Sequence, residues 1–214
     1  MPGAIGALDC THVKICKPGG RRGYGDEYIN RKGVASINVQ ASCDAQERFT
    51  SIDANWPGSV HDSRIWKNSD VGRFVTKTLG DGHLLGDEGY GIAPWLMTPY
   101  GNPVQPHERT FNRIHKKERA VIERCFGQLK KRFPILLGQV RLRIPKVPSV
   151  VVACCVLHNA AKYLNDRDDD FIDAQDDDDE EGDEDDDDAD LRIRHRGQER
   201  RRAISEILHD GNQN

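Results

Sequence analysis

An acidic low-complexity segment limits how much of this chain can build a hydrophobic core. Residues 166–190 hold 15 aspartates and three glutamates against one arginine, which gives a net charge of −17. Like charges at this density repel one another and leave almost no apolar surface to bury, so we expect the segment to be disordered. One domain is therefore expected within residues 1–165, which is long enough for a single hydrophobic core.

Charge is distributed unevenly along the chain. The total of −4 conceals a net charge of +10 over residues 1–165 and +3 over residues 191–214. We expect the latter to form a basic C-terminal segment with a short helix. A basic domain indicates a polyanionic partner, although a merely solvated cationic surface explains the same composition.

Several classes of protein are excluded by what the sequence lacks. The longest apolar stretch, Val150–Leu157, is far shorter than the ~18 residues of a membrane span, so no membrane partner is expected. The N-terminus has no signal-peptide pattern. The six cysteines show neither a paired metal spacing nor a disulfide framework, so we expect reduced and mostly buried thiols.

The pattern of apolar residues predicts an α/β fold. Three early strands favour an antiparallel meander, and a capping box at Ser59 and Asp62 predicts a helix start. The helix near the C-terminal end of the domain is apolar almost all round, so we expect it to be central and buried. The predicted elements are strands at 4–16, 34–42, 48–54 and 83–85, an irregular stretch at 91–108 with room for one short strand, and helices at 61–77, 110–133 and 149–164.

Acidic residues stand at unusual places in two predicted strands. Asp9 interrupts the apolar first strand, where a buried carboxylate is costly without a partner. Asp87 follows a short apolar strand and lies between Gly86 and Gly89, which permit a tight turn. Ordinary structural explanations also exist, because Asp9 can face solvent on an edge strand and Asp87 can cap its own turn.

A third acid, Glu123, lies on the long predicted helix. Helical geometry places Lys116, Arg119, Gly127 and Lys130 on its face. A surface ion-pair network explains this face equally well. Gly127 nevertheless needs a packing or approach reason, since a glycine inside a helix costs ~1 kcal/mol relative to alanine.

Together these acids suggest metal-dependent chemistry on phosphate. Carboxylate oxygens are the ligands that Mg²⁺ prefers, and two such ions can clamp the attacking and leaving oxygens of a phosphoryl displacement. Asp62 lies in the first turn of its predicted helix, where an anion is favoured, and joins the set. The cations expected to contact DNA phosphates are Arg31, Lys32, Lys116, Arg119 and Lys130.

Seven short motifs in a fixed order point to a known family. They are Gly6–His12, Tyr28–Gly33, Ser36–Gln40, Trp56–Arg64, Gly86–Tyr90, Val121–Lys130 and Cys155–Asn159. In these stretches the chain resembles the catalytic domain of PIF/Harbinger-type transposases and of Harbinger transposase-derived nucleases, a branch of the DDE superfamily.

The resemblance implies a fold, a site and a cofactor. The fold would be RNase H-like, a mixed sheet with an early antiparallel meander flanked by helices. Asp9, Asp87 and Glu123 would be the catalytic acids, with Asp62 as an additional metal ligand, and the cofactor would be Mg²⁺ or Mn²⁺. The sequence departs from the family at Cys10, where members usually have glycine after the first acid.

The resemblance also implies partners and a location. DNA would be the substrate, a separate helix-turn-helix or Myb-like protein would supply further DNA binding, and the protein would act in the nucleus or in both nucleus and cytoplasm. Members of the family carry a helix-turn-helix region before this domain, so we expect a fragment, a truncated gene model or a degenerate copy.

Three functions compete on these grounds. The first is a metal-dependent endonuclease that hydrolyses DNA phosphodiester bonds by a two-metal mechanism, with strand transfer as an additional reaction. The second is a catalytically inactive domain of transposon origin that binds DNA or protein. The third is a chaperone or DNA mimic that acts through its acidic segment.

Overall fold

The described part of the chain folds around a mixed β-sheet. The computed structural model describes residues 1–19, 25–78, 80–166 and 188–211. The sheet has the strand order β3-β2-β1-β4-β5, in which β1 to β3 are antiparallel and β4 and β5 run parallel to β1. The strands are β1 (Ala4–Lys14), β2 (Ser36–Cys43), β3 (Phe49–Pro57), β4 (His83–Leu85) and β5 (Leu96–Met97). The expected α/β class and the early antiparallel meander are confirmed.

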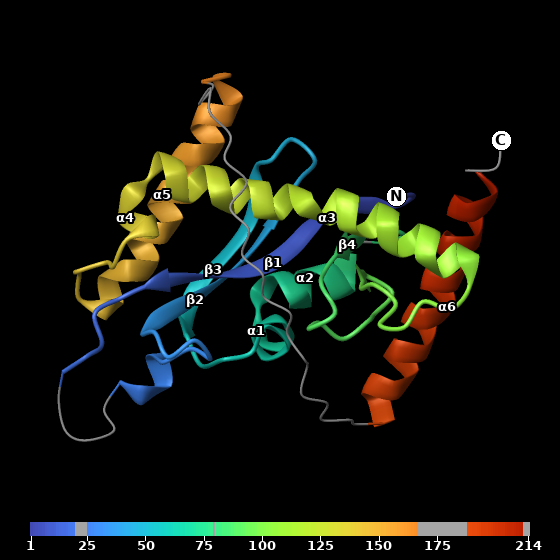
Figure 1. Ribbon diagram of the computed structural model, residues 1–214, viewed down its shortest axis with the longest axis horizontal. Helices are drawn as coiled ribbons and strands as arrows, with labels where there is room; N and C mark the ends of the chain where they lie inside the picture. Colours follow the sequence, from blue (N-terminus) through green and yellow to red (C-terminus); the bar gives the residue numbers. More distant parts are fainter. Residues whose placement is uncertain (20–24, 79, 167–187, 212–214) are drawn as a thin grey trace.

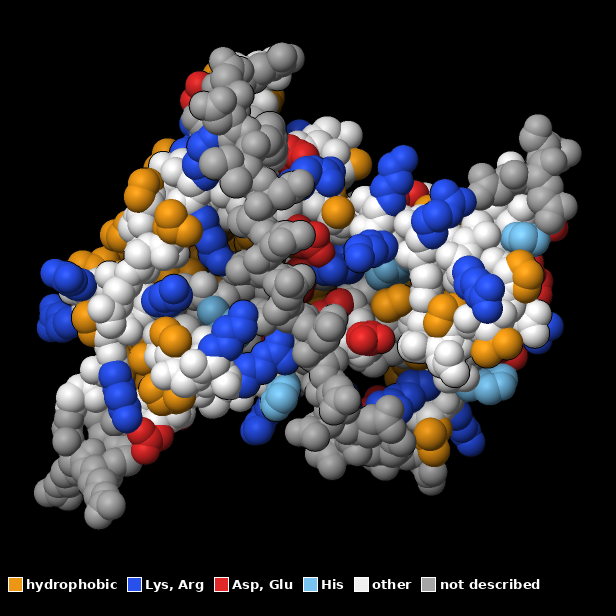
Figure 2. All heavy atoms as spheres, viewed as in Figure 1, with side chains coloured by type: hydrophobic (Ala, Val, Ile, Leu, Met, Phe, Trp, Pro, Cys, Tyr) orange, Lys and Arg blue, Asp and Glu red, His pale blue; other side chains and the backbone are white. Residues whose placement is uncertain are grey.

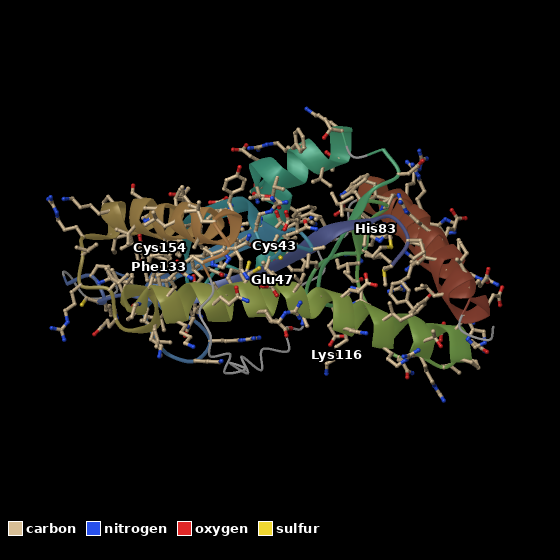
Figure 3. All side chains as sticks on the ribbon, turned by 90° about the horizontal axis from the view of Figure 1, so that it is seen from above. Cys43, Glu47, His83, Lys116, Phe133 and Cys154 are labelled. Carbon is tan, nitrogen blue, oxygen red and sulfur yellow. The ribbon has the colours of Figure 1, made fainter. Side chains whose placement is uncertain are left out.

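Helices cover both faces of the sheet. On one face lies α3 (Pro106–Arg132), and α1 (Asp62–Asn68) and α2 (Asp70–Thr78) lie on the other (Figures 1 and 3). After α3 the chain continues through α4 (Pro134–Leu137) to α5 (Val147–Tyr163), which packs against β3. Two short 3₁₀ helices, Asp26–Tyr28 and Ile144–Lys146, complete the connections. All eight residues of β2 are buried because its two faces are both covered.

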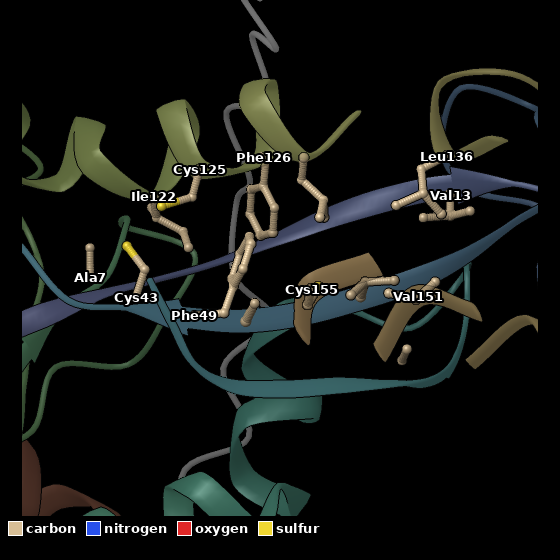
Figure 4. Packing of buried hydrophobic residues seen from close by; sticks show 14 of the residues in the cluster. Ala7, Val13, Cys43, Phe49, Ile122, Cys125, Phe126, Leu136, Val151 and Cys155 are labelled. Atoms are coloured by element: carbon tan, nitrogen blue, oxygen red, sulfur yellow. The ribbon is translucent and has the colours of Figure 1, made fainter. Parts of the chain in front are cut away.

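Among the residues that the structure describes, the hydrophobic core has one large and one small cluster. In the large cluster, the apolar stripe of α3 meets the residues of β1 to β3 (Figure 4). Phe126 of α3 and Phe49 of β3 lie with ring centroids 5.9 Å apart. The small cluster joins Leu8 of β1 and Leu84 of β4 to Trp66 of α1. Alternate residues of β1 thus pack into opposite clusters, because successive side chains of a strand point to opposite faces of the sheet.

The predicted helix 61–77 is wrong as a single element. The chain breaks at Ser69, whose ψ of 150° is extended, and its hydroxyl accepts the amide of Gly72 to begin α2. The predicted capping box at its start is also wrong. His61 is the N-cap and makes no side-chain capping bond. The carboxylate of Asp62 is instead buried, where it accepts a hydrogen bond from Asn38 at 2.9 Å.

The expectation that the apolar helix α5 would be central and fully buried is wrong. One side packs against β3, but Val152, Val156 and Leu157 on the other side are 41%, 58% and 56% exposed. By length and mean hydropathy alone, Ile144–Tyr163 could cross a membrane. This is weak evidence, because the core helices of globular domains meet the same criterion.

Two polar residues in the C-terminal half of α5, His158 and Asn159, bind the turn between β2 and β3. Asn159 accepts the amide of Phe49 and donates to its carbonyl, both at 2.8 Å, and His158 lies 2.9 Å from the carbonyl of Glu47. Both side chains of α5 are therefore satisfied by backbone groups of this turn. The Glu47 carboxylate accepts from Arg124 and Gln128 of α3 and from Lys162 of α5. This turn therefore ties two helices to the sheet.

The basic segment at the C-terminus forms a long helix, α6 (Asp188–Asp210), which packs against α3 and β5. Ile204 is buried in the large cluster, and Arg201 lies over the ring of Tyr100 at 3.9 Å while it donates to the Pro99 carbonyl at 2.7 Å. The sequence predicts only a short helix here. Most of the acidic segment, residues 167–187, lies outside the described residues.

Candidate active site

One arginine connects two of the predicted acids. Arg119, on α3, donates from Nη1 to Asp9 Oδ2 of β1 at 2.7 Å and from Nη2 to Glu123 Oε1 at 2.5 Å. Asp9 can reach α3 because odd-numbered residues of β1 face this helix, as Ala7 and Val13 do in the large cluster. Glu123 reaches the same guanidinium because it lies one helical turn after Arg119. Asp9 and Glu123 therefore lie on the same side of the sheet.

Asp87 is the third predicted acid, and its charge acts on Arg119 and Asp9. It follows β4, which pairs with β1, and its Oδ1 accepts the amide of Gly89 at 3.1 Å. This bond is the turn cap that the sequence allowed as a structural explanation. The charge of Asp87 also acts on both Asp9 and Arg119. The structure thus brings two of the predicted catalytic acids into contact with one guanidinium and leaves the third within electrostatic reach of it.

Burial dominates the electrostatics of Asp9. The side chain of Asp9 is 16% exposed and that of Arg119 19% exposed, whereas Glu123 is 47% exposed. The pKa of Asp9 is raised to about 7, first by burial and then by the charges of Asp87 and Glu123, against the opposing effects of Arg119 and the Cys10 amide. A carboxyl group with this pKa indicates a site that is withdrawn from water, and the neighbouring negative charges add to the effect of burial.

Asp62, the fourth predicted acid, lies beside the face of β1 that is opposite to Arg119. Its neighbours are Asn38, which donates to it, and Cys10, whose thiol pKa is raised first by burial and then by the Asp62 charge. The Cys10 sulfur lies 3.3 Å from the Tyr90 hydroxyl, and Asp9, Asp62 and Asp87 all raise the pKa of Tyr90 after burial. Tyr90 therefore lies within electrostatic reach of acids on both faces of β1.

The four predicted phosphate-binding cations other than Arg119 fall into two groups. Lys116 and Lys130 share the Glu123 face of α3, and Lys and Arg side chains gather along the surface that this helix crosses (Figure 2). Arg31 and Lys32 occupy an exposed turn before β2, held by Asn30, whose Oδ1 accepts the amides of Lys32 and Val34.

The structure does not bring Arg31 and Lys32 to the acids. The turn that carries them precedes Ser36, which pairs with Lys14 at the end of β1, five residues beyond Asp9. At the rise of a strand, that is about 17 Å away.

Gly127, one turn after Glu123, has no packing reason. Within the described part of the chain, and apart from its sequence neighbours and the backbone of its own helix, no heavy atom lies within 4 Å of the position that a Cβ would take there. The remaining explanation from the sequence is that this surface leaves room for a group that approaches from outside.

The donor chemistry of the acid group suits a hard divalent cation, because Asp9, Asp87 and Glu123 offer only carboxylate oxygens. Buried acceptors without a hydrogen-bond donor also lie near Asp62 and Cys10, namely Asn38 Oδ1 and Gln40 Oε1. The arrangement of these side chains suits a metal ion less well than their donor atoms do. Among residues 1–19, 25–78, 80–166 and 188–211, no group of three or more His, Cys, Asp or Glu side chains is placed to hold a metal ion.

Sequence reasoning missed the bridging position of Arg119, which it treated as a phosphate contact or as one member of a surface ion-pair network. The signal was available, because arginine four residues before glutamate is a favourable helical ion pair. It also missed Asn38 and Tyr90. No local pattern identifies either residue, since each reaches the site only through the pairing of strands and the packing of the turn after β4.

Comparisons with known proteins agree with the motifs. A family model described as DDE superfamily endonuclease matches residues 8–159. The chain is 37% identical over 163 residues to "Putative nuclease HARBI1" of Rattus norvegicus and 36% identical to that of Homo sapiens, in both cases over 74% of this chain. It is 29% identical over 194 residues, 82% of this chain, to "Protein ALP1-like" of Arabidopsis thaliana.

The matches leave part of each relative uncovered. The chain spans 46% of the length of each of these three relatives. No solved structure matches the chain significantly. The family match ends at residue 159, so α6 lies beyond it.

Proposed function

The chain belongs to the DDE superfamily of endonucleases, and from this premise we propose that it hydrolyses DNA phosphodiester bonds with the help of divalent metal ions. The observation that carries the proposal is that Arg119 binds both Asp9 and Glu123 while the charge of Asp87 acts on the same guanidinium. These acids come from two strands and one helix that are far apart in sequence. A surface ion-pair network does not need a buried aspartate with a raised pKa at its centre.

Each acid has a part in this proposal. Asp9, Asp87 and Glu123 would hold Mg²⁺ or Mn²⁺. Asp62 would be an additional metal ligand from the opposite face of β1. When bound, the metal supplies an activated water and neutralises charge on the phosphate. Glu123, the most exposed of the three acids beside Arg119, faces the surface from which a DNA strand would approach. Asn38 keeps Asp62 in place through its hydrogen bond.

The cations around the acids would bind the DNA backbone. Lys116 and Lys130 flank Glu123 on α3, and Gly127 between them leaves space for a phosphate to come close. Arg31 and Lys32 would contact the strand farther along, beyond the end of β1. Such contacts do not depend on base sequence and weaken as salt concentration rises.

The fold, partners and location follow from the same proposal. The strand order 3-2-1-4-5, with an antiparallel meander and two parallel strands, supports an RNase H-like fold. We propose DNA as substrate, a separate helix-turn-helix or Myb-like protein as a partner that selects the target, and the nucleus as the place of action.

The test is nicking of supercoiled plasmid DNA by the full chain. The proposal predicts nicking in Mn²⁺ or Mg²⁺ and none in EDTA. Asp87→Asn should abolish nicking. Asp70→Asn is the matched control, because Asp70 is 98% exposed on α2, and this variant should cut like the wild type. Equal activity of Asp87→Asn and the wild type would contradict the proposed site.

A second function, a catalytically inactive domain that binds DNA or protein, is favoured by one observation. Arg119 neutralises Asp9 and Glu123, and the described residues contain no ready group of metal ligands. The same assay separates the two functions. An inactive domain would bind the plasmid without nicking it in either metal, and Asp87→Asn would bind as well as the wild type.

A further inference from the structure

Arg119 lies where a cation is needed among the three acids. Two of its nitrogens bind two different carboxylates, Asp9 at 2.7 Å and Glu123 at 2.5 Å. Asp9, Glu123 and Asp87 are also the charges that raise the pKa of Arg119, against the lowering effect of burial. The guanidinium therefore lies between two of the acids and within electrostatic reach of the third.

The position of Arg119 explains why the acids offer the right donor atoms for a metal ion but are not arranged around one. A planar guanidinium binds carboxylates at hydrogen-bond distances, whereas Mg²⁺ needs oxygens at about 2.0–2.1 Å in a near-octahedral shell. Oxygens that accept from Arg119 point toward its nitrogens. They are not free to turn toward a smaller ion in the same place.

We propose that Arg119 is an internal counter-ion that competes with the divalent metal, so that the metal binds only when Arg119 releases at least one carboxylate. The inference rests on the proposed function, because it takes Asp9, Asp87 and Glu123 as the metal ligands. Arg119 is thus a positioning residue. It holds like-charged side chains together while no metal is bound and must move when one is.

The geometry favours Glu123 as the carboxylate that is released first. Its side chain is 47% exposed, so water can replace the guanidinium, whereas Asp9 is 16% exposed and has less access to water. Arg119 can then remain paired with Asp9 or turn outward along α3. Either movement needs only side-chain rotation, since both residues lie on one regular helix.

The experiment measures binding of Mn²⁺ by calorimetry to the full chain, without DNA. Arg119→Gln should bind Mn²⁺ at least about tenfold more tightly than the wild type, equivalent to about 1.4 kcal/mol. Lys117→Gln is the matched control, because Lys117 is exposed on the same helix but faces away from the acids. It removes the same charge, and its affinity should stay within about twofold of the wild type.

Thermal unfolding gives a second readout. Without metal, Arg119→Gln should melt at a lower temperature than the wild type, because three carboxylates lose their counter-ion. Saturating Mn²⁺ should raise its melting temperature more than that of the wild type. If Arg119→Gln does not fold, Arg119→Lys replaces it. A single ammonium cannot bridge both acids as a guanidinium does, so this variant should also bind Mn²⁺ more tightly than the wild type.

The outcomes separate the inference from the function on which it rests. Tighter Mn²⁺ binding by the Arg119 variants with an unchanged Lys117→Gln supports both. Equal or weaker binding by the Arg119 variants, with clear binding by the wild type, overturns the competition and leaves the metal site intact. Failure of every variant and of the wild type to bind Mn²⁺ overturns the metal site itself.

Discussion

Two glycines inside helices differ in their surroundings, and the same substitution should have opposite effects on them. Gly127 of α3 borders open space, whereas a Cβ at Gly197 of α6 would lie 2.9–3.0 Å from backbone atoms of Ala93. Gly127→Ala should raise the free energy of unfolding by about 0.5–1 kcal/mol, because alanine favours the helix. Gly197→Ala should lower it by about 1–3 kcal/mol, because the backbone of another segment must move. Urea denaturation measures both.

The comparison has a built-in control, since both changes add one methyl group to a helix. A change of the same sign in both variants would contradict the packing described for α6. Gly127→Ala also tests the approach surface. It should weaken DNA binding in a gel-shift assay although it stabilises the fold, and unchanged DNA affinity would show that no phosphate comes close to this position.

At the scale of single elements, the turn between β2 and β3 depends on the ionised carboxylate of Glu47. Hydrogen bonds from Lys162, Gln128 and Arg124 outweigh partial burial and lower its pKa to about 2. A lowered pKa stabilises the fold above the unfolded pKa of 4.5, and this contribution is lost as the pH falls toward 2. Glu47→Gln should therefore cost about 1–3 kcal/mol between pH 5 and 8.

The measurement is the difference in unfolding free energy between Glu47→Gln and the wild type across pH. The difference should be flat above pH 5 and shrink as the pH falls below 4.5. Arg48→Gln is a useful comparison, because Arg48 pairs with Asp44 in the same turn but contacts neither α3 nor α5 through that pair. A smaller cost for Arg48→Gln is expected. A difference for Glu47→Gln that stays constant down to pH 2 would contradict the role of its charge.

Elements with a strong local signal could be predicted from the sequence. Helix α3 follows from the stripe of Ile122, Phe126 and Leu129 and from the stop at Pro134, and the structure ends it at Arg132. The break at Ser69 could not be predicted, because it interrupts an otherwise helical pattern and depends on one hydroxyl that caps α2. The exposure of one side of α5 could not be predicted either. Hydrophobicity shows that a helix can be buried but not what covers it.

The candidate site, too, could be predicted from the sequence only in part. The acids could be identified because Asp9 and Asp87 interrupt or end apolar strands, and Glu123 shares a face with Arg119. Their arrangement could not, because it depends on the pairing of β1 with β4 and on the packing of α3 over β1. The sequence grouped Asp62 with the other acids. Only the structure shows that it lies on the opposite face of β1, bonded to Asn38.

At the scale of the whole molecule, opposite charges on two parts of one chain predict competition with DNA. Residues 166–190 carry −17 and residues 1–165 carry +10. Changing the acids of residues 168–187 to Asn and Gln, which keeps the length of the segment, should strengthen DNA binding at low salt. The gain should fade as salt screens the charges. Titration of a labelled duplex at two salt concentrations measures it. Equal affinities at low salt would rule out the competition.

The most direct test of the account is the cleavage rate of Glu123→Gln beside its DNA affinity, with Lys130→Ala for comparison. Glu123 is half-exposed, so Glu123→Gln should fold normally, bind DNA at least as well as the wild type and fail to cut it in Mn²⁺. Lys130→Ala should bind DNA more weakly on every sequence, with a salt slope lower by about one unit, and should bind Mn²⁺ like the wild type. A Glu123→Gln protein that is unfolded, or one that cuts DNA at the wild-type rate, would contradict the account.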